Sequence, residues 1–285
     1  MLWQDRRESE NIEDRRGMGG KTVVGGIGTL VLMLVVYLLG GNPLQVLQQV
    51  QQNPGQAPAA QQAPANDNTT RFVRTILADT EDFWGRTFSR LGSRYTDPTL
   101  VLFDGATQSG CGFASAATGP FYCPADSRVY LDESFFHELQ NRFHAGGDFA
   151  SAYVIAHEVG HHVQHLLGIT DKVDAQRARL GKSSQNQLSV RLELQADFLA
   201  GMWARYEAQQ AAANGKGTVV QPGDIEQALA AATAIGDDRL QKQTQGYVVP
   251  DAFTHGTSAQ RVRWFKKGFE TDDIRQGDTF NSDNL

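Results

Sequence analysis

Five residues in the middle of the chain, His157-Glu158-Val159-Gly160-His161, constrain its fold more than any other feature. On a helix, side chains four residues apart project from nearly the same side, so His157 and His161 can direct two imidazoles at one place. Two nitrogen ligands of one zinc ion need this spacing. Glu158 lies about 100° further around the helix, where it can exchange a proton with a water without binding the metal. The alternative is that both histidines are ordinary polar residues on a helix face.

The residues around this motif predict the helix that it needs. Apolar side chains precede it at Phe149 and Tyr153, and others follow it at Val163 and Leu166. Asp148 is a candidate N-cap, and Gly168 suits a C-terminal stop.

A catalytic zinc site typically has three protein ligands, so a third must come from elsewhere in the chain. The candidate is Glu193, on a second long helix, with Asp197 one turn later on the same face. Glu193 would bind the ion, and Asp197 would accept a hydrogen bond from the far nitrogen of a ligand histidine. The alternative is two acids on a solvated helix face. The neighbouring residues are apolar all round, which indicates burial, and buried carboxylates need partners.

Size and charge limit the class of protein. The chain has 285 residues, enough for one sizeable domain with extensions, and 40% of its residues are hydrophobic. A net charge of −6, without a basic stripe, argues against a nucleic-acid partner. The two cysteines, Cys111 and Cys123, lack the C-x-x-C spacing of a cysteine-based zinc site. The oligomeric state is not indicated.

The N-terminal part of the chain predicts a membrane anchor. Residues 1–21 are polar and rich in arginine, and residues 22–41 form an apolar run without charges, long enough for one transmembrane helix. A cleaved signal peptide is the alternative, but Gly40-Gly41-Asn42-Pro43-Leu44 is a poor cleavage site. Because the basic residues precede the span, we expect a cytoplasmic N-terminus (residues 1–21). The rest of the protein would then face the periplasm or the exterior of a bacterial inner membrane.

Beyond the anchor, the sequence predicts a disordered tether and one folded domain. Residues 42–70 are rich in Gln, Pro and Ala and cannot bury enough apolar surface to fold. The domain, residues 71–285, has a mostly helical α+β pattern with a small sheet. Its expected helices are 72–88, 135–143, 187–213, 224–235 and 258–269, with strands at 99–103 and 128–131 and a long loop at 104–120. If the domain is extracytoplasmic, Cys111 and Cys123 form a disulfide; the alternative is two free buried thiols.

With these residues in hand, the chain resembles the bacterial neutral zinc metallopeptidases, within the wider group of Glu-liganded zinc peptidases. The matching segments cover most of the domain: 119–124, 129–132, 156–164, 193–197 and 254–258 with Gln260-Arg261. The resemblance implies a zincin-like fold and a peptide or protein substrate. It implies one Zn²⁺ held by His157, His161 and Glu193, with Glu158 as the general base.

Three further roles are hypotheses. The strand Arg128–Leu131 is assigned as the sheet edge on which an extended peptide pairs. A donor to the charged intermediate would be His255 or Tyr130. His255 has an equal alternative, bracing the turn before the last helix. Arg261 is assigned a structural role, and His162 and His165 are placed behind the site or on the surface.

The favoured function is a membrane-anchored, zinc-dependent endopeptidase in which Glu158 accepts a proton from the attacking water. One alternative is a catalytically silent scaffold that binds envelope proteins. The other is a metal-dependent amidase acting on cell-wall peptides.

Overall fold

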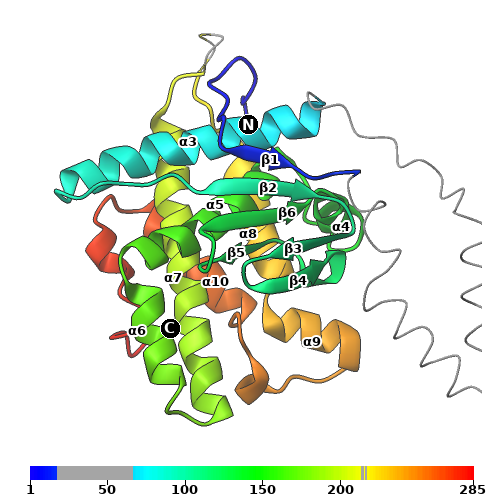
Figure 1. Cartoon of the computed structure of the whole chain (residues 1–285), viewed down its shortest axis with the longest axis vertical. Helices are drawn as coiled ribbons and strands as arrows, with labels where there is room; N and C mark the ends of the chain where they lie inside the picture. Colours follow the sequence, from blue (N-terminus) through cyan, green and yellow to red (C-terminus); the bar gives the residue numbers. More distant parts are fainter. Residues whose placement is uncertain (18–66, 213–214, 216) are drawn as a thin grey trace, which may run out of the picture.

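The computed structural model describes residues 1–17, 67–212, 215 and 217–285. A small sheet is packed against a larger helical layer (Figure 1), which confirms the mixed α+β, mostly helical class. No helix in these described ranges is both long and apolar enough to cross a bilayer. The predicted span at 22–41 and most of the predicted tether lie outside them.

The main sheet has four strands in the order β1-β2-β6-β5. The strands are β1 (Ile12–Asp14), β2 (Thr99–Phe103), β5 (Phe121–Cys123) and β6 (Arg128–Asp132). Strand β2 pairs in parallel with β1 and β6, and β5 runs antiparallel to β6. Strands β2 and β6 are buried, as their apolar runs predict. Strand β5 is therefore an edge strand, whereas β6 is internal.

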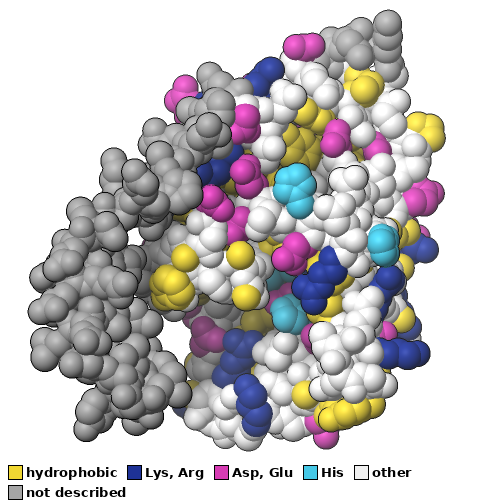
Figure 2. Space-filling model, turned by 90° about the vertical axis from the view of Figure 1, so that its right-hand side faces the viewer, with side chains coloured by type: hydrophobic (Ala, Val, Ile, Leu, Met, Phe, Trp, Pro, Cys, Tyr) yellow, Lys and Arg dark blue, Asp and Glu magenta, His cyan; other side chains and the backbone are white. Residues whose placement is uncertain are grey.

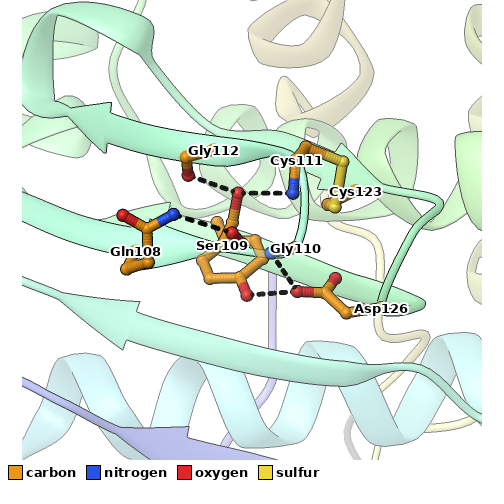
Figure 3. The surroundings of a disulfide bond; sticks show 8 residues. Gln108, Ser109, Gly110, Cys111, Gly112, Cys123 and Asp126 are labelled. Carbon is orange, nitrogen blue, oxygen red and sulfur yellow. Dashed lines mark hydrogen bonds between the residues drawn. A yellow bond between two sulfur atoms is a disulfide. The ribbon is translucent and has the colours of Figure 1, made fainter.

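The predicted loop at 104–120 is instead largely ordered. It contains a hairpin of β3 (Ala106–Ser109) and β4 (Gly112–Ser115), followed by η1 (Ala116–Thr118). The disulfide between Cys111 and Cys123 ties the hairpin turn to β5, which confirms the predicted pairing (Figure 3). Asp126 accepts hydrogen bonds from the backbone N–H of Gly110 and from the hydroxyl of Tyr130, each at 2.7 Å.

Eight α-helices are described. They are α3 (Asn68–Arg90), α4 (Ser134–Asn141), α5 (Asp148–Leu166), α6 (Ile169–Arg177), α7 (Lys182–Gln209), α8 (Asp224–Ala234), α9 (Asp237–Gln245) and α10 (Ser258–Phe269). Short 3₁₀ turns, η2 (Pro250–Ala252) and η3 (Ile274–Gly277), flank α10. The helix around the histidine motif spans 19 residues, and Gly168 follows it with a φ of 68°. Its N-cap is Gly147, not Asp148, whose carboxylate accepts a hydrogen bond from the indole of Trp3.

Helices α5, α7 and α10 pack closely through glycines. A Cβ added to Gly160 of the histidine motif would lie 3.1 Å from the carbonyl oxygen of Ala196 on α7. Only glycine leaves room for this approach without displacing the neighbouring backbone. On the other side of α7, Gly268 of α10 lies directly against the backbone of Phe198. The two contacts hold α7 between the other helices.

Residues 1–17 are part of the same folded unit. Strand β1 extends the sheet beside β2 at the edge near α3 (Figure 1), and Trp3 is 8% exposed within the main hydrophobic core. The predicted domain boundary near Arg71 therefore needs correction, because the fold includes this N-terminal segment. Strand β1 could not be predicted locally, since three residues reading Ile-Glu-Asp have no recognisable strand pattern.

Candidate metal centre

The structure brings His157 and His161 of α5 together with Glu193 of α7. The Nε2 atoms of the two histidines lie 3.1 and 3.4 Å from the two carboxylate oxygens of Glu193. One ligand atom from each residue can be chosen so that all three lie within 4.8 Å of one another. Tetrahedral zinc with bonds of about 2.0–2.1 Å sets its ligand atoms roughly 3.4 Å apart. The three side chains therefore fit a zinc ion, both in donor type and in spacing.

Hydrogen bonds fix the tautomer of each histidine. The Nδ1 of His157 lies 2.9 Å from Asp197 Oδ1, and the Nδ1 of His161 lies 2.9 Å from the Oε1 of Gln164. In the neutral form of each ring the acceptor requires the proton on Nδ1, so Nε2 carries the lone pair that binds a metal. Gln164 is itself held by donating to the carbonyl of Leu192 on α7. Both imidazoles therefore present Nε2 to the same point.

Asp197 is held from behind by α10. The Nε of Arg261 donates to one oxygen of Asp197 at 2.8 Å, and its Nη2 donates to the other at 3.0 Å. The hydroxyl of Tyr153 adds a third donor at 2.5 Å. Asp197 and Arg261 are 0% and 1% exposed. Arg261 thus fixes the carboxylate that orients His157, a link that the sequence did not reveal because the two residues are 64 positions apart.

The charges of this cluster suit a cation. Burial opposes charge on His157, but the carboxylates of Asp197 and Glu193 outweigh it and raise the pKa of His157 to about 10. Burial likewise opposes charge on Glu193, yet His161 and His255 hold its pKa well below the usual value. A metal ion at this point would displace the proton from His157. Zinc binding should therefore weaken as the pH falls.

A cavity of about 870 Å³ opens over the three residues. Glu158 lines it beside His157 and His161, while Phe121 and Tyr122 of the edge strand β5 form part of another wall. On the face seen in Figure 2, histidine and acidic side chains come together in a hollow. The size lies within the range of ligand sites, about 300–1,000 Å³.

His255 lines the same cavity and is 50% exposed. Its Nδ1 lies 3.2 Å from Asp237 Oδ1, and Asp237 also accepts the backbone N–H groups of Thr254, His255 and Gly256. Burial opposes charge on the ring, but the nearby carboxylates of Glu193 and Asp237 raise the pKa of His255. The residue therefore both belongs to the site and sits in the turn before α10. Both sequence hypotheses for it remain compatible with this position.

The structure corrects two sequence assignments. Tyr130 does not line the cavity: it is 1% exposed, stacks on Phe121 and donates to Asp126. The strand Arg128–Leu131 lies inside the sheet between β2 and β5, so it cannot be the substrate edge. Strand order depends on pairing that local sequence does not encode, and in the part of the chain that the structure describes the outer strand beside the cavity is β5.

His162 links the edge strand to the histidine helix. Its Nδ1 lies 3.0 Å from the hydroxyl of Tyr122 on β5, and its Nε2 lies 2.7 Å from the carbonyl oxygen of Thr96. Burial lowers the pKa of His162 to about 4, so the ring is neutral at neutral pH. A neutral ring that donates to Thr96 must accept from Tyr122. His162 thus holds β5 beside α5.

A family model described as "Putative neutral zinc metallopeptidase" matches residues 1–280. The chain belongs to this family. The zinc metallopeptidase match spans almost the whole chain, including the N-terminal segment and the residues of the metal centre.

Two relatives illustrate the breadth of this metallopeptidase family. "Uncharacterized protein YpfJ" of Escherichia coli K12 is 48% identical over 290 residues, covering 98% of this chain and 99% of the relative. "Uncharacterized protein Rv2575" of Mycobacterium tuberculosis is 42% identical over 222 residues, covering 76% of this chain and 74% of the relative. No solved structure matches the chain.

The Asp197 contacts predict an effect on metal affinity. Asp197→Asn removes the charged acceptor of His157 and should weaken zinc binding about 10–100-fold, measured by competition with a chelating dye. Tyr153→Phe is the matched control, because it removes one donor to Asp197 but leaves His157 and Arg261 in contact with it. Equal zinc affinity of Asp197→Asn and the control would show that the carboxylate does not orient the ligand.

Proposed function

We propose that this metallopeptidase hydrolyses peptide bonds with one zinc ion held by His157, His161 and Glu193. The observation that carries the proposal is the convergence of two Nε2 atoms on one carboxylate, with Glu158 beside them in an open cavity. When bound, zinc would supply a Lewis acid that polarises the scissile carbonyl and acidifies water. A zincin-like arrangement, in which the histidine helix lies beneath a sheet edge, agrees with the contact between α5 and β5.

Glu158 would act as the proton carrier. Glu158 lines the cavity together with both histidines but is not one of the three residues that converge. It can therefore accept a proton from the attacking water and pass it to the leaving amine.

The edge strand β5 would hold the substrate. Among the described residues no strand pairs with its opposite edge, and Phe121 and Tyr122 line the cavity that Glu158 also lines. An extended peptide can add to such an edge through main-chain hydrogen bonds. Docking against β5 would place a peptide bond across the centre, where His255 could donate to the developing oxyanion.

His255→Gln should then lower kcat while the zinc content of the protein stays unchanged. An unchanged kcat would leave His255 with only the role of bracing the turn before α10.

The cellular location is a separate part of the proposal. The disulfide between Cys111 and Cys123 supports an extracytoplasmic domain, since such bonds persist mainly in oxidising compartments. Attachment to the membrane through residues 22–41 stays a prediction from the sequence.

Metal removal tests the proposal and its rivals together. The chelated protein should not cleave an unfolded protein substrate, and one equivalent of zinc should restore cleavage. Peptidoglycan fragments, assayed in parallel, separate the peptidase from a cell-wall amidase. If the zinc-restored protein cleaves neither substrate, the scaffold alternative stands instead.

A further inference from the structure

The N-terminal segment, residues 1–17, is docked along its whole length on the rest of the described fold, residues 67–285 with their gaps, which is called the zinc domain below. Strand β1 pairs with β2 in register from Ile12 opposite Leu100 to Asp14 opposite Leu102. Backbone hydrogen bonds extend the contact on both sides, from Leu100 N–H to Asn11 and from Arg15 N–H to Leu102. Such pairing requires the two strands to lie in one compartment.

Trp3 anchors the beginning of the segment at the histidine helix. Its ring packs at 5.5 Å from that of Phe72, and its indole N–H donates to the carboxylate of Asp148 at 3.0 Å. Asp148 is the first residue of α5. The segment thus touches the start of the helix that carries the metal centre.

Arg6 pairs with two buried acidic side chains. It lies 2.7 Å from Asp79 on α3 and 2.6 Å from Glu207 on α7, whose side chains are 4% and 0% exposed. If the segment were elsewhere, these acids would face each other without a cation in the interior. The domain is therefore built to hold the segment.

Arg16 holds together the two points at which residues 18–66 leave and rejoin the described fold. Its guanidinium pairs with Asp14 just before it and with Asp67, the N-cap of α3, at 2.7 and 2.9 Å. Glu133 completes the cluster at 2.8 Å. The chain thus departs after Gly17 and returns at Asp67 in the same place.

These contacts bear directly on membrane topology. We infer that residues 1–17 lie on the same side of the membrane as the zinc domain. A single crossing within residues 18–66 would place β1 and β2 on opposite sides, which their pairing forbids. Attachment through the apolar stretch 22–41 would then have to be from one face of the membrane. This conclusion does not depend on whether the protein hydrolyses peptides.

The sequence pointed to a cytoplasmic N-terminus because arginines precede the apolar stretch. In the structure each of these arginines pairs with acids of the fold: Arg6, Arg7, Arg15 and Arg16. Three of the four reach acids on α3, α7 or the N-cap of α3. The charges of Arg6, Arg7 and Arg16 are therefore used to dock the segment on the domain.

Single-cysteine labelling of the full chain tests the inference. The only two cysteines of the sequence form the disulfide, so an introduced cysteine is a unique free thiol. Glu10→Cys reports on the N-terminal segment and Lys182→Cys on the domain, since both residues are exposed and neither forms a side-chain hydrogen bond or ion pair within the described residues. Intact spheroplasts of a bacterial host are treated with a membrane-impermeant maleimide. Total thiol is then measured in denaturant, with the unaltered chain as background.

We expect both variants to be labelled in intact spheroplasts to the same extent, at least about 80% of the total. If both thiols were protected from the maleimide until the spheroplasts were lysed, the two positions would again lie on one side of the membrane. The side would then be the cytoplasmic one. Labelling of one variant with protection of the other would overturn the inference. Gln4→Cys, at a second exposed position of the segment, guards against a local effect at residue 10.

Discussion

Glu158→Gln is expected to keep its zinc and lose peptide hydrolysis, with kcat/KM falling by roughly 10²–10⁴-fold or more. Glutamine has nearly the same shape as glutamate but cannot accept a proton at neutral pH. Glu158 lines the cavity without belonging to the group that could hold the metal, so zinc content should not change. Hydrolysis is measured on a fluorogenic peptide, and zinc by elemental analysis of the same sample.

Glu138→Gln is the matched control for this prediction. Glu138 lines the same cavity, but its side chain is 45% exposed and pairs only with Arg142 at 3.6 Å among the described residues. The same chemical change at this position should alter kcat/KM by less than about twofold, because an exposed pair is worth little. Near-normal hydrolysis by Glu158→Gln would remove the carboxylate from the mechanism.

Arg6→Met is expected to lower the free energy of unfolding by about 3–5 kcal/mol, the usual cost of leaving buried charge without its partner. For a domain of this size, the loss corresponds to roughly 10 °C in Tm. Arg7→Met removes the same charge from the next residue. That side chain is 47% exposed, and its buried partner Glu81 keeps hydrogen bonds from Ser9 and Asn11, so its loss should cost no more than about 1 kcal/mol. Equal effects would show that the N-terminal segment is not docked through Arg6.

The effect of Arg6→Met should grow with pH. Burial, together with the neighbouring Glu207 carboxylate, raises the pKa of Asp79 to about 9, against 3.8 in the unfolded chain. A group with a raised pKa contributes its stability at low pH and loses it as the pH rises towards the folded value. Arg6 also holds down the pKa of the buried Glu207, so its removal should let a second carboxyl keep its proton in the folded protein and steepen the loss of stability as the pH rises above about 4. Thermal unfolding across that range measures the slope.

The sequence predicted the elements whose signals are local. The helix around His157 and His161 follows from its spacing and its glycine stop, and Glu193 followed from an acid in an otherwise apolar stretch. Strand β2 and helix α10 were predicted at their observed bounds. In each case the residues that define the element are neighbours in the chain.

The features that were missed depend on distant residues. The docking of Trp3 and Arg6 requires α3, α5 and α7, which lie far along the chain. Helix α9 has almost no apolar face and is held by Asp237, whose carboxylate accepts the backbone N–H groups of the turn before α10. Arg261 looked structural, yet its position fixes the acid behind His157. Such roles follow from packing, which a single sequence does not display.

Zinc stoichiometry of Glu193→Ala, measured by elemental analysis beside the unaltered protein, tests the central claim most directly. We predict one zinc per chain for the unaltered protein and for Glu138→Gln, and less than about a tenth of that for Glu193→Ala after equal dialysis. Circular dichroism establishes that the variant is folded. A folded Glu193→Ala protein that retained one zinc with unchanged affinity would contradict a centre built from His157, His161 and Glu193.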